Sequence, residues 1–141
     1  MKGIERIPGN IRAIREAISE LLDVFSPFFQ DTSDAIRVKI CLFEALANAF
    51  IHGNAQDPQK RIRVRWEADG GHGDFWVSDE GPGIPPDLLQ PGNSAAEKEI
   101  LSENGRGLSM IRKTANRLEL LQDGKELFFG FDWGKTSDLD R

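Results

Sequence analysis

Apolar residues recur at three- and four-residue spacing in two stretches of the first half of the chain, and this spacing predicts two amphipathic helices. The first covers residues 11–25, where Asn10 can cap its start and Ser26-Pro27 ends it. The second begins after the capping residues 31–34 and runs to Gly53, which stands where a helix needs a left-handed terminating residue. Its apolar positions are Ile36, Ile40, Phe43, Ala47, Phe50 and Ile51.

Strict alternation replaces this spacing in residues 61–66, where Ile62, Val64 and Trp66 share one face and three arginines share the other. Such alternation predicts a half-buried antiparallel strand with its charged face in water. Residues 74–78 alternate as well and complete a hairpin across a glycine-rich turn. The other predicted strands are residues 3–7 at a sheet edge, and residues 118–121 and 126–133 around the turn 122–125.

The segment before the last two strands is different in character. Residues 87–104 are mostly polar or small with a weak helical pattern, which is typical of a lid. Gly105-Arg106-Gly107 then opens a third helix, whose apolar positions are Leu108, Ile111, Ala115 and Leu118. A glycine-rich helix start presents backbone N–H groups at the positive end of the helix dipole, where a phosphate binds well.

Composition narrows the class of protein. The chain has 141 residues, 39% hydrophobic and 29% charged, as in an ordinary globular domain. Its net charge of -5 disfavours a dedicated nucleic-acid binder. The single Cys41 cannot form an internal disulfide and fits a core position in its helix. Because no apolar run is long enough to span a bilayer and no signal-peptide core precedes the first helix, we expect a cytoplasmic protein without a membrane partner.

Three polar residues interrupt the apolar second helix at four-residue intervals: Glu44, Asn48 and His52. On a helix this spacing stacks them on one side. One interpretation is a hydrogen-bonded Glu-Asn pair on a solvated stripe. The other is a Mg²⁺ and water site, in which Asn48 gives one neutral oxygen and Glu44 orients or deprotonates the attacking group.

Two glycine-rich segments bear on this choice. Asp79-Glu80-Gly81-Pro82-Gly83 follows the predicted strand 74–78, and alone it would be explained by a tight turn. Gly105-x-Gly107 alone is weak evidence, because glycines are common in loops. Together and in this order, Glu44-x-x-x-Asn48, Asp79-x-Gly81-x-Gly83 and Gly105-x-Gly107 resemble the N, G1 and G2 boxes of the GHKL ATPase superfamily.

The likeness spans nearly the whole chain and implies a fold. That fold is the Bergerat-type α/β (α+β) two-layer sandwich, in which helices cover one face of a mixed, mostly antiparallel sheet. The resemblance assigns residues 1–134 to a histidine-kinase-like ATPase domain and leaves residues 135–141 as a polar tail.

The resemblance also implies ATP and Mg²⁺ as cofactors and a role for each matching residue. Asn48 matches the Mg²⁺ ligand and Glu44 the general base. Asp79 should accept a hydrogen bond from the adenine amino group, while Gly81 and Gly83 let the backbone approach the purine. Gly105 and Gly107 should bracket the phosphates, with Arg106 adding charge. The expected nucleotide-binding set is Asn48, Asp79, Gly81, Gly83, Ile84, Gly105, Arg106, Gly107 and Leu108.

Within the superfamily, the small size and the run from Glu44 to Ala49, followed by His52-Gly53-Asn54, look most like the anti-sigma factor serine kinases. This implies phosphorylation of a serine on a STAS-type anti-sigma factor antagonist and control of a sigma factor by partner switching. Relatives often pair, so a homodimer is also an expectation. The alternatives are an ATP-gated binding module with little catalysis, and a histidine kinase catalytic domain that acts in trans.

One position departs from the family pattern. Family members commonly carry a threonine after the glycine at the turn into the last strand, where it helps to hold the adenine site. Here Gly124 is followed by Lys125. Either the register of the turn differs or that contact is missing.

Overall fold

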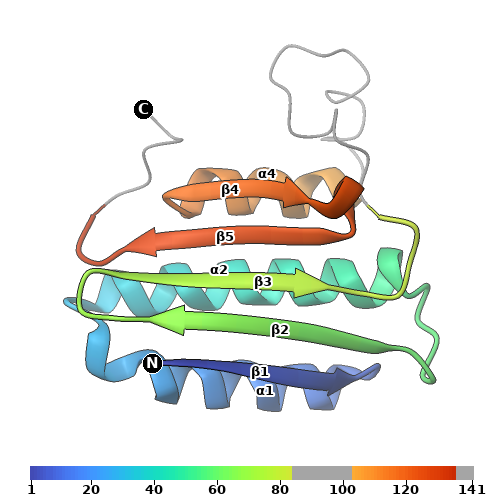
Figure 1. Ribbon diagram of the computed structural model, residues 1–141, viewed down its shortest axis with the longest axis horizontal. Helices are drawn as coiled ribbons and strands as arrows, with labels where there is room; N and C mark the ends of the chain where they lie inside the picture. The colour runs from blue at the N-terminus through green and yellow to red at the C-terminus, as the bar shows by residue number, and fades with distance from the viewer. Residues whose placement is uncertain (84–102, 136–141) are drawn as a thin grey trace, which may run out of the picture.

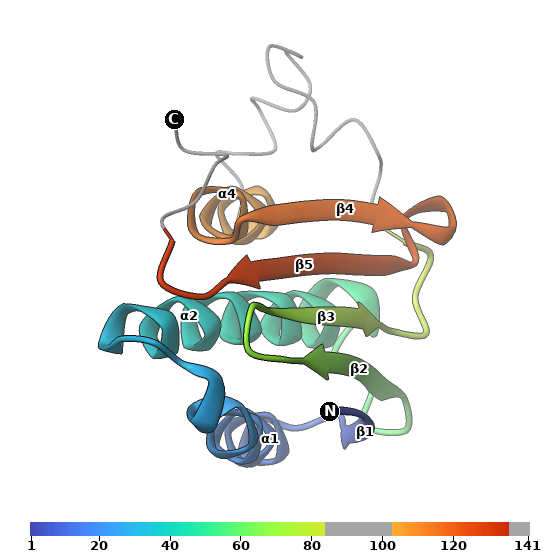
Figure 2. The same cartoon turned by 60° about the vertical axis from the view of Figure 1, so that its left-hand side comes forward.

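The computed structural model describes residues 1–83 and 103–135; of residues 103–106 it describes the backbone only. They form two layers, a sheet and the helices that cover one of its faces (Figures 1 and 2). The strands are β1 (Lys2–Pro8), β2 (Arg61–Ala68), β3 (His72–Ser78), β4 (Arg117–Leu121) and β5 (Glu126–Asp132). The α-helices are α1 (Ile11–Phe25), α2 (Thr32–Asn48) and α4 (Glu103–Thr114).

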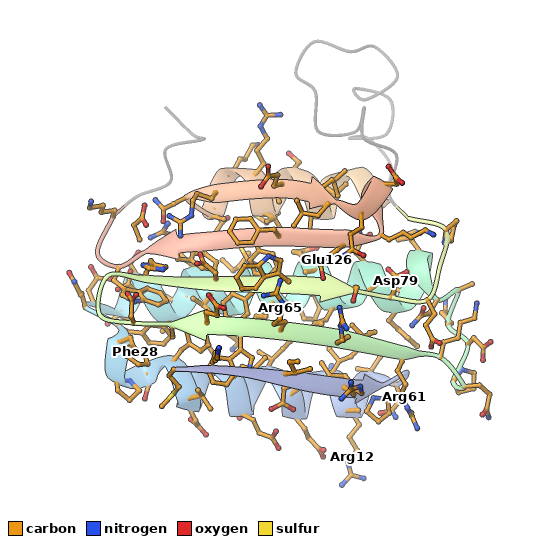
Figure 3. The ribbon with its side chains drawn as sticks, viewed as in Figure 1. Arg12, Phe28, Arg61, Arg65, Asp79 and Glu126 are labelled. Atoms are coloured by element: carbon orange, nitrogen blue, oxygen red, sulfur yellow. The ribbon has the colours of Figure 1, made fainter. Side chains whose placement is uncertain are left out.

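The five-stranded sheet has the order β1-β2-β3-β5-β4, and each pairing between neighbours is antiparallel. This confirms the expected two-layer fold with a mostly antiparallel sheet. The alternation in β2 works as predicted, since Ile62 and Val64 are fully buried. On the open face, the Arg65 guanidinium lies 3.9 Å from the ring centroid of Trp76 (Figure 3).

Helix α1 has the predicted bounds. The Asn10 side chain accepts a hydrogen bond from the Ala13 N–H at 2.7 Å and caps the first turn. Pro27 then lies in a short 3-10 turn, Ser26–Phe28, that ends the helix. The apolar stripe of α1 is buried through Ile14, Ala17, Ile18, Leu21 and Phe25.

Helix α2 is capped by Asp31, but it buries a different face from the one its sequence indicates. The face against the sheet carries Val38, Cys41, Leu42, Ala45 and Leu46. The predicted apolar face was wrong, because Ile36 and Phe43 are 54% and 50% exposed. Helix α2 carries two apolar stripes, and packing on the sheet, which no local spacing encodes, selects the one with the smaller Cys41 and Ala45.

Aromatic rings join α1 to the centre of the sheet. Phe25 stacks on Phe75 with a centroid separation of 4.7 Å, and Phe75 stacks on Phe129 at 5.3 Å. All three are fully buried. Such rings are large contributors to core stability, so the sheet and the helical layer are held as one unit.

Helix α4 ends earlier than its apolar spacing predicts. Asn116 turns to the sheet, where its N–H donates to the Gly130 carbonyl at 2.9 Å and its Oδ1 accepts from the Asp132 N–H at 2.8 Å. Leu118, which was expected on the helix, therefore lies in β4 opposite Phe129. Helix α4 also begins earlier, at Glu103, so Gly105 and Gly107 lie inside its first turns.

The chain brings four separate segments to one end of the molecule. These are the last turns of α2, the end of β3, the first turn of α4 and the turn between β4 and β5 (Figure 1). All three glycine-rich or polar motifs of the sequence lie at this end.

Candidate functional site

The end of α2 changes its winding where it reaches the site. Residues Ala49–Gly53 form a π-helical turn, closed by a hydrogen bond of 2.8 Å from the Asn54 N–H to the Ala49 carbonyl. Gly53 does not adopt a left-handed conformation, so that prediction was wrong; the positive φ values fall on Ala55 and Gln56, at 52° and 60°. Single π turns inside helices often mark functional sites.

Gly53 is needed for a different reason. A Cβ at this position would overlap the carboxylate of Asp79. A Cβ on Gly81 would likewise overlap the Gly53 carbonyl. The α2 end and the loop after β3 therefore approach more closely than any other residue at these two positions would allow.

The Asp79 carboxylate lies just beyond the end of β3, at the site end of the sheet (Figure 3). Its Oδ1 accepts a hydrogen bond of 2.7 Å from the Gly81 N–H, which fixes the orientation of the group. Burial raises the pKa of Asp79, and the Gly81 hydrogen bond and the charge of Lys60 oppose the rise. One carboxylate oxygen is thus held by the loop, while the other can accept a hydrogen bond from a ligand.

A small cavity of about 80 Å³ lies in front of this carboxylate. Polar and apolar groups contribute to its wall in similar measure, and its polar side chains are those of Asp79, Asn48 and His52. Apolar side chains beside one anchored acceptor suit a flat aromatic ring that carries an amino group. The lining residues are Ala45, Asn48, Ala49, His52, Gly53, Val77, Asp79, Gly83 and Leu127.

Gly83 connects this cavity to the turn before β5. Its φ is 98°, a value that favours glycine, and a Cβ there would lie 3.0 Å from the Asp123 carbonyl oxygen. The turn Gln122–Gly124 is a 3-10 turn with Gln122 and Asp123 at positive φ. It therefore stands beside the cavity, and the next position is occupied by Lys125, an exposed residue.

A second hollow, of about 440 Å³, adjoins the first through two shared residues, Asn48 and His52. Glu44, Asn48 and His52 all line it, which confirms that their four-residue spacing puts them on one side of the helix. The opposite wall is α4: a Cβ on Gly107 would lie 3.1 Å from Oε2 of Glu44. The remaining lining residues are Phe43, Ala47, Ile51 and Met110.

The side chains of Glu44 and Asn48 make no hydrogen bond with each other or with any other group that the structure describes. This leaves no support, within residues 1–83 and 103–135, for the alternative of a mutually bonded pair. Glu44 is partly buried, and burial raises its pKa. A carboxylate that is partly desolvated and unpaired is suited to accept a proton from a reacting hydroxyl group.

Other predicted site residues are placed less completely. Gly105 and Arg106 lie in α4, although the Arg106 side chain is outside the described part. The Leu108 side chain is only 2% exposed and packs in the core. Ile84 and the proposed lid, residues 87–104, lie wholly or largely outside the described residues.

Comparison with known proteins now bears on the identity of this site. The model of the histidine kinase-like ATPase domain family matches residues 6–129. The chain belongs to this family. The GHKL resemblance is thereby confirmed, and members of this superfamily bind ATP, typically with Mg²⁺.

A solved structure agrees with this assignment at the level of the fold. The histidine kinase-like ATPase domain described here is similar to the catalytic domain of histidine kinase ThkA in a nucleotide-free form, with a TM-score of 0.53 and 18% sequence identity. The match covers 92% of this chain and 97% of that chain. Among curated proteins, none matches the chain. No helix in the described ranges is long and apolar enough to cross a membrane.

The residues of this ATPase domain fit a Mg²⁺-nucleotide. Asp79 and the apolar side chains of the small cavity fit an adenine ring, and Gly81 and Gly83 allow the loop after β3 to pack closely against Gly53 and the turn before β5. Asn48, at the boundary of the two hollows, is the residue that would give a neutral oxygen to a Mg²⁺ ion bound with the nucleotide. Gly107 lets α4 come close to Glu44.

Sequence analysis missed the part played by Gly53 and its neighbour Asn54. Asn54 is fully buried, and its side chain bonds to two other segments. The available signal was the run Gly53-Asn54 directly after a polar helix end. The partners lie up to 26 residues away in sequence, so the contact itself was not visible.

Proposed function

We propose that this domain is an ATP-dependent protein serine kinase of the anti-sigma factor type. Its substrate would be a serine on a STAS-type anti-sigma factor antagonist, in the cytoplasm, and phosphorylation would control release or capture of a sigma factor. The observation that carries the proposal is the position of Glu44. Its carboxylate has no hydrogen-bond partner among the described residues and lies with Asn48 in a hollow that adjoins the Asp79 cavity.

Each residue of the site has a separate role in the proposed reaction. Asp79 and the apolar side chains of the small cavity select and orient the base, and Asn48 would hold the metal. Mg²⁺-ATP supplies the phosphoryl group and the charge neutralisation that phosphoryl transfer requires. Glu44 takes the proton of the serine hydroxyl as the oxygen forms its bond to phosphorus, so the products are phosphoserine and ADP. A raised pKa favours this role, because it makes the carboxylate a better base.

The test is phosphate transfer from γ-labelled ATP to a panel of STAS-type antagonists. Glu44→Gln should lower transfer by about 10²-fold or more and change the ATP dissociation constant little, since it removes a base and not a binding group. Glu119→Gln, an exposed carboxylate on β4, is the matched control and should transfer at the wild-type rate.

Three results would contradict the proposal. Transfer that persists unchanged in Glu44→Gln would remove the general base. An acid-labile product would indicate a phosphohistidine and favour a histidine kinase acting in trans. Tight ATP binding with no transfer to any antagonist would favour the ATP-gated binding module.

A further inference from the structure

Asn54 ties together three segments that meet behind the Asp79 carboxylate. Its side chain is fully buried. Oδ1 accepts a hydrogen bond of 2.7 Å from the Glu80 N–H, and Nδ2 donates to the Arg61 carbonyl at 3.0 Å. The first partner follows β3 and the second begins β2, while Asn54 itself closes the π turn of α2. The two partners have opposite polarity, so they fix the orientation of the carboxamide.

A further hydrogen bond closes a hydrogen-bonded ring of three residues, Asn54, Glu80 and Arg61. The carboxylate of Glu80 accepts a hydrogen bond of 2.6 Å from the Arg61 N–H. Arg61 is thus held through both its N–H and its carbonyl, one by Glu80 and the other by Asn54. Glu80 is exposed and Asn54 is buried, so the ring extends from the surface to the interior.

This hydrogen-bonded ring contacts the residues on either side of the Asp79 carboxylate. The Glu80 N–H belongs to the peptide that follows Asp79, so Asn54 fixes the backbone of Asp79 on its C-terminal side. Gly53, which precedes Asn54, is the residue against which the Asp79 carboxylate packs. Asn54 therefore holds both the chain that carries the carboxylate and the wall behind it.

We propose that Asn54 is a positioning residue for base recognition, which holds Asp79 where it can distinguish a purine with a 6-amino group from one without. The proposal rests on the ATP-binding function argued above and adds a determinant of its specificity. Asn54 touches no nucleotide in this scheme and acts through Asp79.

The test compares ATP with purine riboside triphosphate, in which hydrogen replaces the 6-amino group. Wild-type protein should prefer ATP, and Asp79→Asn should remove that preference. Asn54→Ala should weaken ATP binding by about tenfold or more while changing the affinity for the analogue little, since the analogue makes no bond to Asp79. The ATP-to-analogue ratio is the decisive quantity, because a general loss of stability would lower both affinities together.

Asn116→Ala is the matched control. Asn116 is also a buried asparagine whose side chain accepts a hydrogen bond from a backbone N–H, that of Asp132, but it lies at the end of β5 away from the site. It should lower the melting temperature and leave the ratio unchanged. A folded Asn54→Ala protein that keeps the wild-type ratio would overturn the proposal.

If Asn54→Ala does not fold, Glu80→Ala decides instead. It removes the surface tie to Arg61 and should shift the ratio in the same direction; an unchanged ratio would overturn the proposal. If wild-type protein does not bind ATP, the proposed function is overturned as well. If wild-type protein prefers ATP and the Asn54→Ala and Glu80→Ala variants keep the same preference, only this inference is overturned.

Discussion

Asp79 and Glu44 both lie in partly buried surroundings that raise their pKa, but they are held in different ways. Asp79 is fixed through one oxygen by the Gly81 N–H. Glu44 has no hydrogen-bond partner among the described residues and faces Gly107 across the larger hollow. A fixed acceptor suits recognition, and an unpaired carboxylate suits proton transfer.

The raised pKa of Asp79 has a consequence for stability. Because the folded-state pKa lies above that of the unfolded chain, folding favours the protonated form, and this contribution is lost as the pH rises through the folded pKa. At neutral pH the ionised group therefore destabilises the fold. Asp79→Asn should leave the melting temperature at neutral pH unchanged or raise it. At pH values just above the ordinary pKa of aspartate, the melting temperature of the variant should also depend less on pH than that of wild-type protein.

Asp74→Asn is the control for this melting experiment. Asp74 is paired with Arg117 at 2.8 Å, so its loss should lower stability by about 1 kcal/mol. A lower melting temperature for Asp79→Asn than for Asp74→Asn would show that the Asp79 carboxylate supports the fold, contrary to this account.

Among the elements, the π turn at the end of α2 does most to shape the site. It carries His52, which lines both hollows, and it brings Gly53 against the loop after β3. Glycine is normally unfavourable in a helical turn by about 1 kcal/mol relative to alanine. Its presence here is explained by the contact with Asp79 and not by backbone conformation.

Gly53→Ala tests this explanation. Local propensity favours alanine, yet its Cβ would displace the Asp79 carboxylate, so ATP affinity measured by calorimetry should fall by at least about tenfold. Gly70→Ala is the control, because nothing lies within 4 Å of a Cβ at Gly70. Equal ATP affinity in both variants would contradict the close packing of α2 against the Asp79 loop.

At the scale of the whole molecule, the sheet decides which face of each helix is buried. Leu42 and Ile36 lie on the same helix, yet Leu42 is fully buried and Ile36 is 54% exposed. Leu42→Ala should cost about 2–5 kcal/mol in the free energy of unfolding, whereas Ile36→Ala should change it by less than about 0.5 kcal/mol. Urea denaturation measures both, and similar costs for the two would contradict the packing of α2.

Much of this architecture follows from local patterns. Periodicity predicted α1 to the residue, the alternation predicted β2 and β3, and motif spacing placed Glu44 and Asn48 on one side of α2. The buried face of α2 did not follow, because two apolar stripes compete and the sheet chooses between them. The roles of Gly53 and Asn54 and the early end of α4 before Asn116 did not follow either, since each depends on a partner distant in sequence.

Calorimetric titration with Mg²⁺-ATP and Mg²⁺-GTP, on wild-type protein and on Asp79→Asn, tests the central claim most directly. The Asp79 carboxylate beside the small cavity should accept a hydrogen bond from adenine and reject guanine, whose 6-oxo group is itself an acceptor. We predict binding of ATP and not GTP by wild-type protein, with at least about tenfold weaker ATP binding in Asp79→Asn. Equal binding of the two nucleotides, or ATP binding that survives unchanged in Asp79→Asn, would contradict it.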